Sequence, residues 1–293
     1  MEQPPSYLKQ RKTMTSNGRI ISLDKPLVMG IINVTDDSFY NGSRYKLGFR
    51  IAARAEQIIR EGGSIIDVGA CSTRPGAKPV SEQQELKRLA KALHAIRKKY
   101  PEAIISVDTY RSRVARMAVG DYRANIINDI SAGELDPEMF STIAELKIPY
   151  VLMHMRGTPE TMQQNPTYDN VIREIITYLN GKIEQLKQLG VSDIIVDPGF
   201  GFGKTVDHNF SILKNLQVFR LFERPILVGL SRKSMISKTL EIPAAKCLNG
   251  TTVLNTMALL NGATILRVHD VREATEAIKL VESTTRQPDY QYI

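Results

Sequence analysis

Short apolar runs rich in β-branched residues recur along this 293-residue chain and alternate with longer amphipathic stretches. The runs are Leu27–Asn33, Ser64–Val68, Ala103–Asp108, Asn125–Asp129, Tyr150–His154, Asp193–Asp197, Pro225–Leu230 and Thr264–His269. A continuous apolar run of about five or six residues is typical of a strand covered on both faces, as in a parallel sheet. The pattern therefore predicts a parallel sheet with helices packed on it.

The stretches between the runs include segments with apolar residues at helical spacing. They are Phe49–Glu61, Ser81–Lys98, Asn170–Leu189 and Val271–Val281. In the second of them, we expect Ser81 and Glu85 to lie near the N-terminal cap.

Eight strand-like runs with helical connections predict a single α/β domain folded as a (β/α)₈ TIM barrel. We place the barrel at residues 26–282, with residues 1–25 as an N-terminal surface extension and residues 283–293 as a surface tail. A doubly wound open sheet is the alternative, but the eighth unit leaves no obvious edge strand. No composition break divides the chain.

The composition of the chain limits the classes of molecule that it is expected to bind. No apolar run approaches the ~20 residues that span a bilayer, and the N-terminus is too polar for a secretory signal, so we expect no membrane partner. Two distant cysteines, Cys71 and Cys247, fit a reducing cytoplasm. The net charge of +8 invites anionic ligands. We expect no nucleic-acid partner, because the cations are scattered, tryptophan is absent and no recognition motif is found.

Polar residues stand at the C-terminal ends of the predicted strands, and the opposite ends lack such a series. They are Asn33, Asp67, Asp108, Asn128, His154, Asp197, Ser231, Arg232, Lys233, Arg267 and His269. Any single one could be a cap or turn residue. In a barrel, however, these ends converge on one mouth, where active sites are built. We therefore expect the active site there.

The chemistry of these residues indicates two kinds of ligand group. Asp108, Asn128 and Asp197 suit the donor and acceptor edge of a flat heterocycle. A cationic set suits a phosphate or diphosphate; its members are Arg74, Lys233, Arg267 and His269. Asn33 offers an oxygen that a hard cation such as Mg²⁺ could use.

The segment Gly199–Lys204 (GFGFGK) is rich in glycine, which lets a backbone approach a ligand closely, and it carries Phe200 and Phe202 to the mouth. It lacks the G-x-x-x-x-G-K-[ST] pattern, so a nucleotide-binding P-loop is not expected.

At these residues the chain resembles the dihydropteroate synthases, the folate-pathway enzymes that sulfonamides inhibit. The resemblance covers about Leu27 to Val281 and is specific because eight motifs occur in order. They are GIINVT-DSF (30–39), DVGACSTRPGA (67–77), SVDTYR (106–111), NDISAG (128–133), LMHMRGTPETMQ (152–163), DPGFGFGKT (197–205), GLSRKS (229–234) and RVHDV (267–271).

The resemblance implies a transferase that joins 4-aminobenzoate to 6-hydroxymethyl-7,8-dihydropterin diphosphate, giving 7,8-dihydropteroate and diphosphate. It implies a pterin site with Met153 packing nearby; the other members are Asp108, Asn128, Asp197 and Lys233. The diphosphate would be held by Asn33, Thr73, Arg74, Arg267 and His269, with Mg²⁺ on Asn33. The pocket for 4-aminobenzoate would be Thr73, Pro75, Phe202 and Ser234. The family is usually dimeric, which implies a homodimer.

The physical logic favours a dissociative, SN1-like substitution without a protein nucleophile, in which Lys233, Arg267 and His269 act at the reaction centre. Two departures from the family pattern, Asp36 in place of a proline and Asn41 in place of an acid, concern the first loop. A pterin-binding methyltransferase domain and a catalytically silent barrel are the competing functions. The methyltransferase has no diphosphate to expel, so the STRPGA, SRKS and RVHD segments together argue against it. The presence of Asn33, Lys233, Arg267 and His269 argues against a silent barrel.

Overall fold

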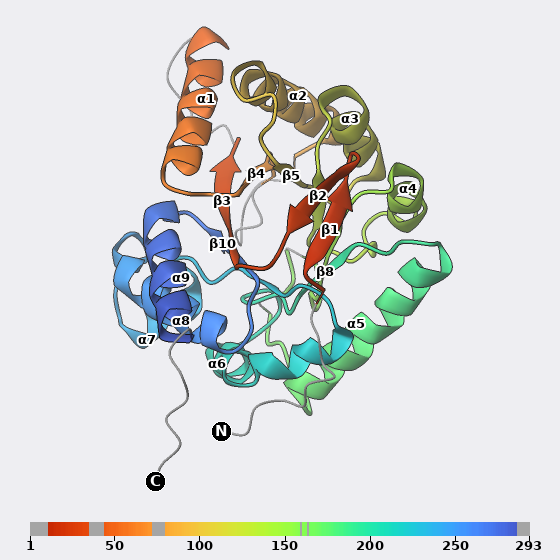
Figure 1. Ribbon diagram of the computed structural model, residues 1–293. Coiled ribbons are helices and arrows are strands. Elements are labelled where there is room, and N and C mark those ends of the chain that lie inside the picture. Colours follow the sequence, from red (N-terminus) through yellow and green to blue (C-terminus); the bar gives the residue numbers. More distant parts are fainter. Residues whose placement is uncertain (1–10, 35–43, 72–79, 159, 163, 286–293) are drawn as a thin grey trace.

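The computed structural model describes residues 11–34, 44–71, 80–158, 160–162 and 164–285. Eight parallel strands surround a central axis, and helices form an outer ring (Figure 1). The strands are β3 (Leu27–Asn33), β4 (Ile65–Gly69), β5 (Ile105–Asp108), β6 (Ile126–Asp129), β7 (Tyr150–Met153), β8 (Ile194–Asp197), β9 (Leu227–Val228) and β10 (Ile265–Val268). Each lies within or beside a predicted run, so the eight strand predictions are confirmed.

The sheet closes into a barrel. Strands are hydrogen-bonded in the order β8-β7-β6-β5-β4-β3-β10-β9. A parallel bridge between Val196 and Ile226 joins the two ends, and the Val196 N–H donates to the Pro225 carbonyl at 2.8 Å. This closure confirms the TIM barrel and excludes the open doubly wound sheet.

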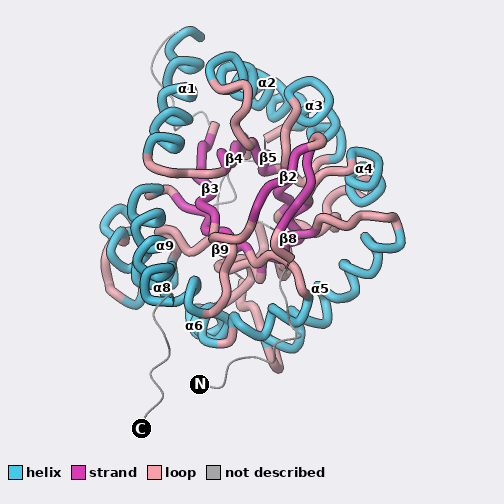
Figure 2. Tube along the Cα trace, in the orientation of Figure 1, coloured by secondary structure: helices cyan, strands magenta, loops and turns pink. Residues whose placement is uncertain are grey.

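Helices alternate with the strands around the ring (Figure 2). They are α1 (Arg44–Arg60), α2 (Glu82–Lys99), α3 (Ser112–Tyr122), α4 (Met139–Leu146), α5 (Val171–Gln188), α6 (Val206–Lys214), α7 (Ser234–Thr239), α8 (Leu248–Leu260) and α9 (Val271–Thr285). Within the described ranges, none of the helices combines the length and the apolar character needed to cross a bilayer.

The cap of α2 differs in part from the prediction. Ser81 is the N-cap, as expected, and its hydroxyl accepts from the Gln84 N–H. Gln84, rather than Glu85, completes the capping box by accepting from the Ser81 N–H. Glu85 is instead fully buried and pairs with Arg111, because its position on the helix points toward the barrel.

The core has two layers. One fills the space between the strands and the helices, and the other lies inside the barrel at the N-terminal ends of the strands. The inner layer takes one side chain from most strands: Met29, Ile65, Ile126, Val151, Ile195, Leu227 and Ile265. This end of the barrel is therefore closed by packing, and the polar residues lie at the opposite end.

Residues 13–23 lie outside the eight-stranded barrel, as expected of an extension, but part of this segment is buried and not on the surface. Strands β1 (Thr13–Ser16) and β2 (Arg19–Ser22) form an antiparallel hairpin, which crosses the end of the barrel where its strands begin (Figure 1). Met14, Ile21 and Leu23 are buried in the inner layer. The Ser16 hydroxyl donates to the Asn125 carbonyl at 2.8 Å. The hairpin covers apolar residues that a bare barrel would expose to water.

Candidate active site

The strand ends place one arginine between two carboxylates. Arg267, on β10, lies 2.7 Å from Asp67 (Nε to Oδ2) and 2.6 Å from Asp108 (Nη2 to Oδ2). The amide nitrogen of Asn128 approaches the same Asp67 carboxylate at 3.4 Å. The residue predicted for the diphosphate therefore belongs to one network with two residues predicted for the pterin. The Arg267 side chain is 22% exposed, which leaves it accessible from the mouth.

Burial and charge act against each other in this network. Burial raises the pKa of Asp108 to about 7, although the Arg267 charge opposes the shift. Burial alone would lower the pKa of Arg267, but the charges of Asp67 and Asp108 outweigh it and raise that pKa. Arg267 is therefore a permanent cation, while Asp108 can exchange a proton near neutral pH.

A second pair is formed by Asp197, at the end of β8, and Lys233, after β9. Lys233 lies near Arg267, since a Cβ on Gly229 would lie 3.7 Å from Lys233 Nζ and 4.0 Å from Arg267 Cβ. Asp197 ends β8, and its carboxylate accepts from the Gly199 N–H at 2.7 Å. Lys233 precedes α7 and donates to the Phe200 carbonyl, and its Nζ lies 4.9 Å from the centre of the Phe202 ring. Burial lowers the pKa of Lys233 to about 8, with the Asp197 charge opposing this shift. Burial raises the pKa of Asp197.

His269 is a neutral imidazole held in one orientation. Burial, followed by the charge of Arg267, lowers its pKa to about 4. The Ser231 hydroxyl accepts from the His269 backbone N–H at 3.2 Å and lies 3.0 Å from Nδ1. The hydrogen bond between the Ser231 hydroxyl and Nδ1 fixes the orientation of the ring.

The loops that carry Lys233 and His269 are joined by an ion pair. Arg232 contacts Asp270 through two hydrogen bonds of 2.9 and 2.8 Å, and it also donates to the Ala245 carbonyl. A bidentate pair of this kind fixes both partners. The ends of β9 and β10 are therefore held at a constant separation.

The remaining predicted residues are only partly placed. Asn33 ends β3 beside Gly69 of β4, and Met153 ends β7 and is buried. Ser234 is the exposed first residue of α7. Other members of the predicted site lie outside the described residues: Thr73, Arg74 and Pro75, together with the departures Asp36 and Asn41.

The donor chemistry at β3 fits the predicted Mg²⁺. Asn33 ends that strand at the mouth, and its amide carries the hard oxygen that Mg²⁺ prefers. Within the described part of the chain, no cluster of three or more His, Cys, Asp or Glu residues could hold a metal.

Neither the cysteine nor the large hollow beside the site adds a candidate reacting group. Burial, followed by the charge of Glu85, raises the pKa of the Cys71 thiol to about 12, so it is not a nucleophile at neutral pH.

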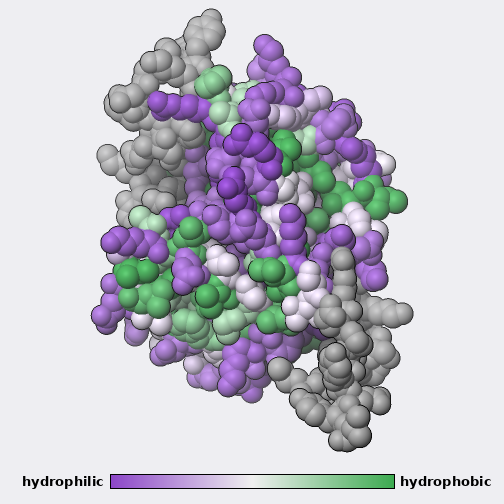
Figure 3. Space-filling view, turned by 60° about the vertical axis from the view of Figure 1, so that its left-hand side comes forward, coloured by the Kyte–Doolittle hydropathy of each residue, from purple (hydrophilic) through white to green (hydrophobic). Residues whose placement is uncertain are grey.

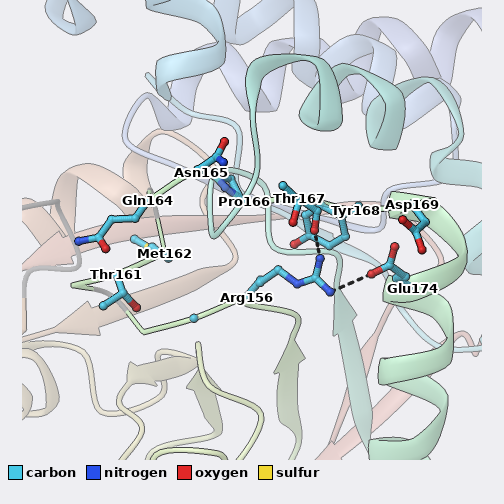
Figure 4. Close-up of a pocket in the computed structure, with 11 residues that line it drawn as sticks. Arg156, Thr161, Met162, Gln164, Asn165, Pro166, Thr167, Tyr168, Asp169 and Glu174 are labelled. Atoms are coloured by element: carbon cyan, nitrogen blue, oxygen red, sulfur yellow. Dashed lines mark hydrogen bonds and ion pairs between the residues drawn. The ribbon is translucent and has the colours of Figure 1, made fainter.

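A hollow of about 540 Å³ follows β7, and Arg156, Tyr168 and Glu174 are among its lining residues (Figure 4). None of the predicted site residues lines it.

Two residues of the site gained no role from the sequence. Asp67 stood in the series of strand-end residues, but only the structure shows it as the fully buried partner of Arg267. Lys204 ended the glycine-rich segment, which was expected to approach a ligand through its backbone, and the lysine itself was given no role. Asp67 could have been identified from its place near the end of a predicted strand. Nothing in the sequence pointed to Lys204, because a lysine after a loop is normally exposed to solvent.

Comparison with known proteins decides the family. The family model described as "Pterin binding enzyme" matches residues 29–269. Dihydropteroate synthase of Escherichia coli (strain K12) is 42% identical over 271 residues, which cover 92% of this chain and 95% of that protein. The chain belongs to the pterin-binding enzymes of the dihydropteroate synthase family.

Solved structures of this family agree. The Yersinia pestis dihydropteroate synthase with a sulfonamide drug has a TM-score of 0.87 and 37% identity, covering 94% of this chain and 100% of that one. The Xanthomonas albilineans enzyme with 4-aminobenzoic acid has a TM-score of 0.87 and 34% identity, covering 94% and 99%. The predicted resemblance is confirmed.

Proposed function

We propose that the chain joins 4-aminobenzoate to 6-hydroxymethyl-7,8-dihydropterin diphosphate, releasing 7,8-dihydropteroate and diphosphate. The contact of Arg267 with both Asp67 and Asp108 carries this proposal. It puts a permanent cation, suited to a diphosphate, beside carboxylates suited to a pterin ring. Family membership supports the pterin, and the Xanthomonas structure with 4-aminobenzoic acid supports the second substrate.

Around the pterin, the chain supplies groups of complementary hydrogen-bonding character. Asp108 and Asp197 accept from ring N–H groups, Lys233 donates to ring acceptors, and the Asn128 amide does both. A carboxylate with a pKa near 7, as at Asp108, can pair with the ring in either protonation state. These residues orient the exocyclic methylene toward the second substrate.

The reaction is a substitution at that methylene. The carbon–oxygen bond to the diphosphate breaks, and its electron pair leaves with the diphosphate. Arg267 and the imidazole of His269 stabilise the negative charge that grows there. A Mg²⁺ ion bound at Asn33 would supply further positive charge to the departing oxygens.

The electron-rich dihydropterin delocalises the positive charge left on the methylene. The 4-aminobenzoate amine, held near Phe202 and Ser234, forms the new carbon–nitrogen bond and loses a proton to solvent. Proximity in the mouth replaces a covalent protein intermediate. The raised pKa of Cys71 supports the absence of a thiol nucleophile.

We also propose that the chain acts as a cytoplasmic homodimer. Its two free cysteines support the location. Apolar side chains gather on the face that bears α7, α8 and α9 (Figure 3). Val253, Met257 and Leu260 of α8 are 50%, 43% and 61% exposed, and a contiguous apolar patch of this kind marks an interface. Sedimentation should show a dimer, and Val253→Glu should shift it toward monomer.

Product formation tests the proposed reaction. With both substrates and Mg²⁺, we expect dihydropteroate to be detected by mass spectrometry, and omission of either substrate should abolish it. A folded protein that binds the pterin but forms no dihydropteroate would contradict the proposal and favour a silent barrel or a methyltransferase.

A further inference from the structure

Lys204 is a buried lysine that the reaction does not use. It follows the loop Gly199–Gly203 and is 3% exposed. Its Nζ lies 2.9 Å from the Gly199 carbonyl, 2.9 Å from the Phe202 carbonyl, 3.2 Å from the His154 carbonyl and 2.9 Å from His154 Nδ1. Carbonyl oxygens only accept, so the amine donates to this set.

Four acceptors surround the Lys204 amine, enough for all three protons of an ammonium. Burial, followed by the charge of Lys204, lowers the pKa of His154 to about 2, so the ring is neutral and Nδ1 can accept. Burial also lowers the pKa of Lys204, whereas the charge of Asp197 opposes that shift. Hydrogen bonds to several acceptors favour the charged amine, and without them a buried cation would be costly.

The loop lies against the end of β7 at backbone distance. A Cβ on Gly199 would lie 1.9 Å from the His154 carbonyl oxygen, and one on Gly203 would lie 2.4 Å from the Arg156 carbonyl oxygen. Both glycines have positive φ, +73° and +64°. Lys204 therefore bridges two backbone segments that are already in direct contact, and it satisfies carbonyls on both.

Aromatic contacts hold the other side of the loop. Tyr168 donates its hydroxyl to the Gly203 carbonyl at 2.8 Å. The guanidinium of Arg156 lies 4.1 Å from the Tyr168 ring centre and pairs with Glu174 at 2.8 Å (Figure 4). Hydrogen bonds therefore hold both ends of the loop: Lys204 contacts the carbonyl of Gly199, and Tyr168 contacts the carbonyl of Gly203.

This loop reaches the predicted pterin residues through its backbone. The Gly199 N–H holds the Asp197 carboxylate at 2.7 Å, and the Phe200 carbonyl accepts from Lys233. Gly201 passes close to the Lys233 side chain, since a Cβ there would lie 3.2 Å from Cδ. Any shift of the loop therefore displaces partners of both Asp197 and Lys233.

We propose that Lys204 is a positioning residue for pterin binding, whose amine ties Gly199 and Phe202 to the end of β7 and so holds Asp197 and Lys233 in place. The inference rests on the proposed function only for the identity of the ligand. Lys204 itself does not touch the ligand; it acts through the loop backbone.

The test compares Lys204→Met with Lys187→Met, which removes a half-exposed lysine from the far end of α5. Affinity for 6-hydroxymethyl-7,8-dihydropterin is measured by calorimetry, with circular dichroism as the check of folding. We expect Lys204→Met to lose at least about tenfold in affinity and Lys187→Met to change less than about twofold. A folded Lys204→Met protein with unchanged affinity would overturn the proposal.

Steady-state kinetics separate positioning from general damage. In Lys204→Met, KM for the dihydropterin diphosphate should rise while KM for 4-aminobenzoate stays within about twofold. An equal rise in both constants would indicate a global effect and overturn the proposal.

A second pair of variants keeps the proposal falsifiable if Lys204→Met fails to fold. His154→Asn retains an acceptor near the position of Nδ1, whereas His154→Leu removes it. We expect the asparagine variant to keep most of the dihydropterin affinity and the leucine variant to lose it. Equal affinities in the two would contradict the role of the amine.

The two proposals fail differently. If the wild-type chain binds the dihydropterin but forms no product, the synthase proposal fails and the binding comparison still decides the role of Lys204. If the wild type does not bind the dihydropterin, both proposals fail.

Discussion

At the scale of residues, the mouth of the barrel holds buried charges, and ion pairs between them offset the free energy of removing each charge from water. The Asp67 side chain is fully buried, and its nearest cation is Arg267 at 2.7 Å. Such a pair is expensive to break, because removing one partner leaves the other charge buried and uncompensated. Arg267 therefore contributes to stability, in addition to the role in diphosphate binding that we propose for it.

Arg267→Ala should show both effects. We expect a loss of about 3–5 kcal/mol in the free energy of unfolding, from urea titration, because Asp67 and Asp108 lose their cation. Turnover should fall at least about tenfold, because charge on the leaving diphosphate is less stabilised. Arg116→Ala, which breaks a surface pair with Glu145, is the control and should change neither. Unchanged turnover in Arg267→Ala would remove Arg267 from the site.

Lys233 gives the site a pH dependence on the alkaline side. Burial lowers its pKa to about 8, so the ammonium is lost as the pH rises through that value. Affinity for the dihydropterin should therefore fall between about pH 7 and about pH 9.5, because deprotonation removes charge that the ligand contacts. Lys233→Met should bind more weakly and lack this decline. A wild type whose affinity does not fall relative to that variant would contradict the assignment.

At the scale of elements, the glycines of the loop after β8 are required by contact and not by flexibility alone. Gly203 combines a φ of +64° with a carbonyl oxygen 2.4 Å from the position of a Cβ. Gly181, in the middle of α5, has nothing within 4 Å of that position. The same substitution should thus have opposite effects at these two sites.

Gly203→Ala should destabilise the protein and weaken binding of the dihydropterin, because the loop must move away from Arg156. Gly181→Ala should stabilise the protein by about 0.5–1 kcal/mol, because alanine has a higher helix propensity than glycine at an exposed position inside a helix. Thermal unfolding of the two variants compares them directly. A stabilised Gly203→Ala protein would show that the loop does not need this close contact.

The elements also show which features the sequence could predict. The barrel strands were predictable because each is a continuous apolar run. The location of Asp108, Asn128, Asp197 and Arg267 at one end of the barrel was predictable because they stand at or near the ends of such runs. The hairpin of residues 13–22 was not, since its strands are four residues long and their apolar pattern is brief. The cap partner Gln84 and the acceptors of Lys204 depend on side-chain directions that spacing alone does not determine.

At the scale of the whole molecule, the inner apolar layer and the charged network lie at opposite ends of the barrel. The hairpin and the inner apolar layer close the end where the strands begin, and the charged network occupies the end where they finish. Truncation of a side chain in the apolar layer should therefore lower stability without changing the site, whereas substitution of Arg267 affects both.

Met14→Ala tests that separation. Met14 is 1% exposed beneath the barrel, and its truncation should cost about 2–5 kcal/mol of stability through the lost packing. KM for both substrates should stay within about twofold of wild type, since the site is at the other end. Ile20→Ala, at a residue that is 75% exposed on the same hairpin, should leave stability unchanged. A large rise in KM for Met14→Ala would show that the two ends are coupled.

We propose that this barrel expels diphosphate and transfers the pterin to an amine. Both steps are followed by measuring diphosphate release from the dihydropterin diphosphate in the presence of Mg²⁺, with and without 4-aminobenzoate. We predict release accompanied by an equal amount of dihydropteroate when 4-aminobenzoate is present. A folded protein that binds the pterin tightly but releases no diphosphate under either condition would contradict the account.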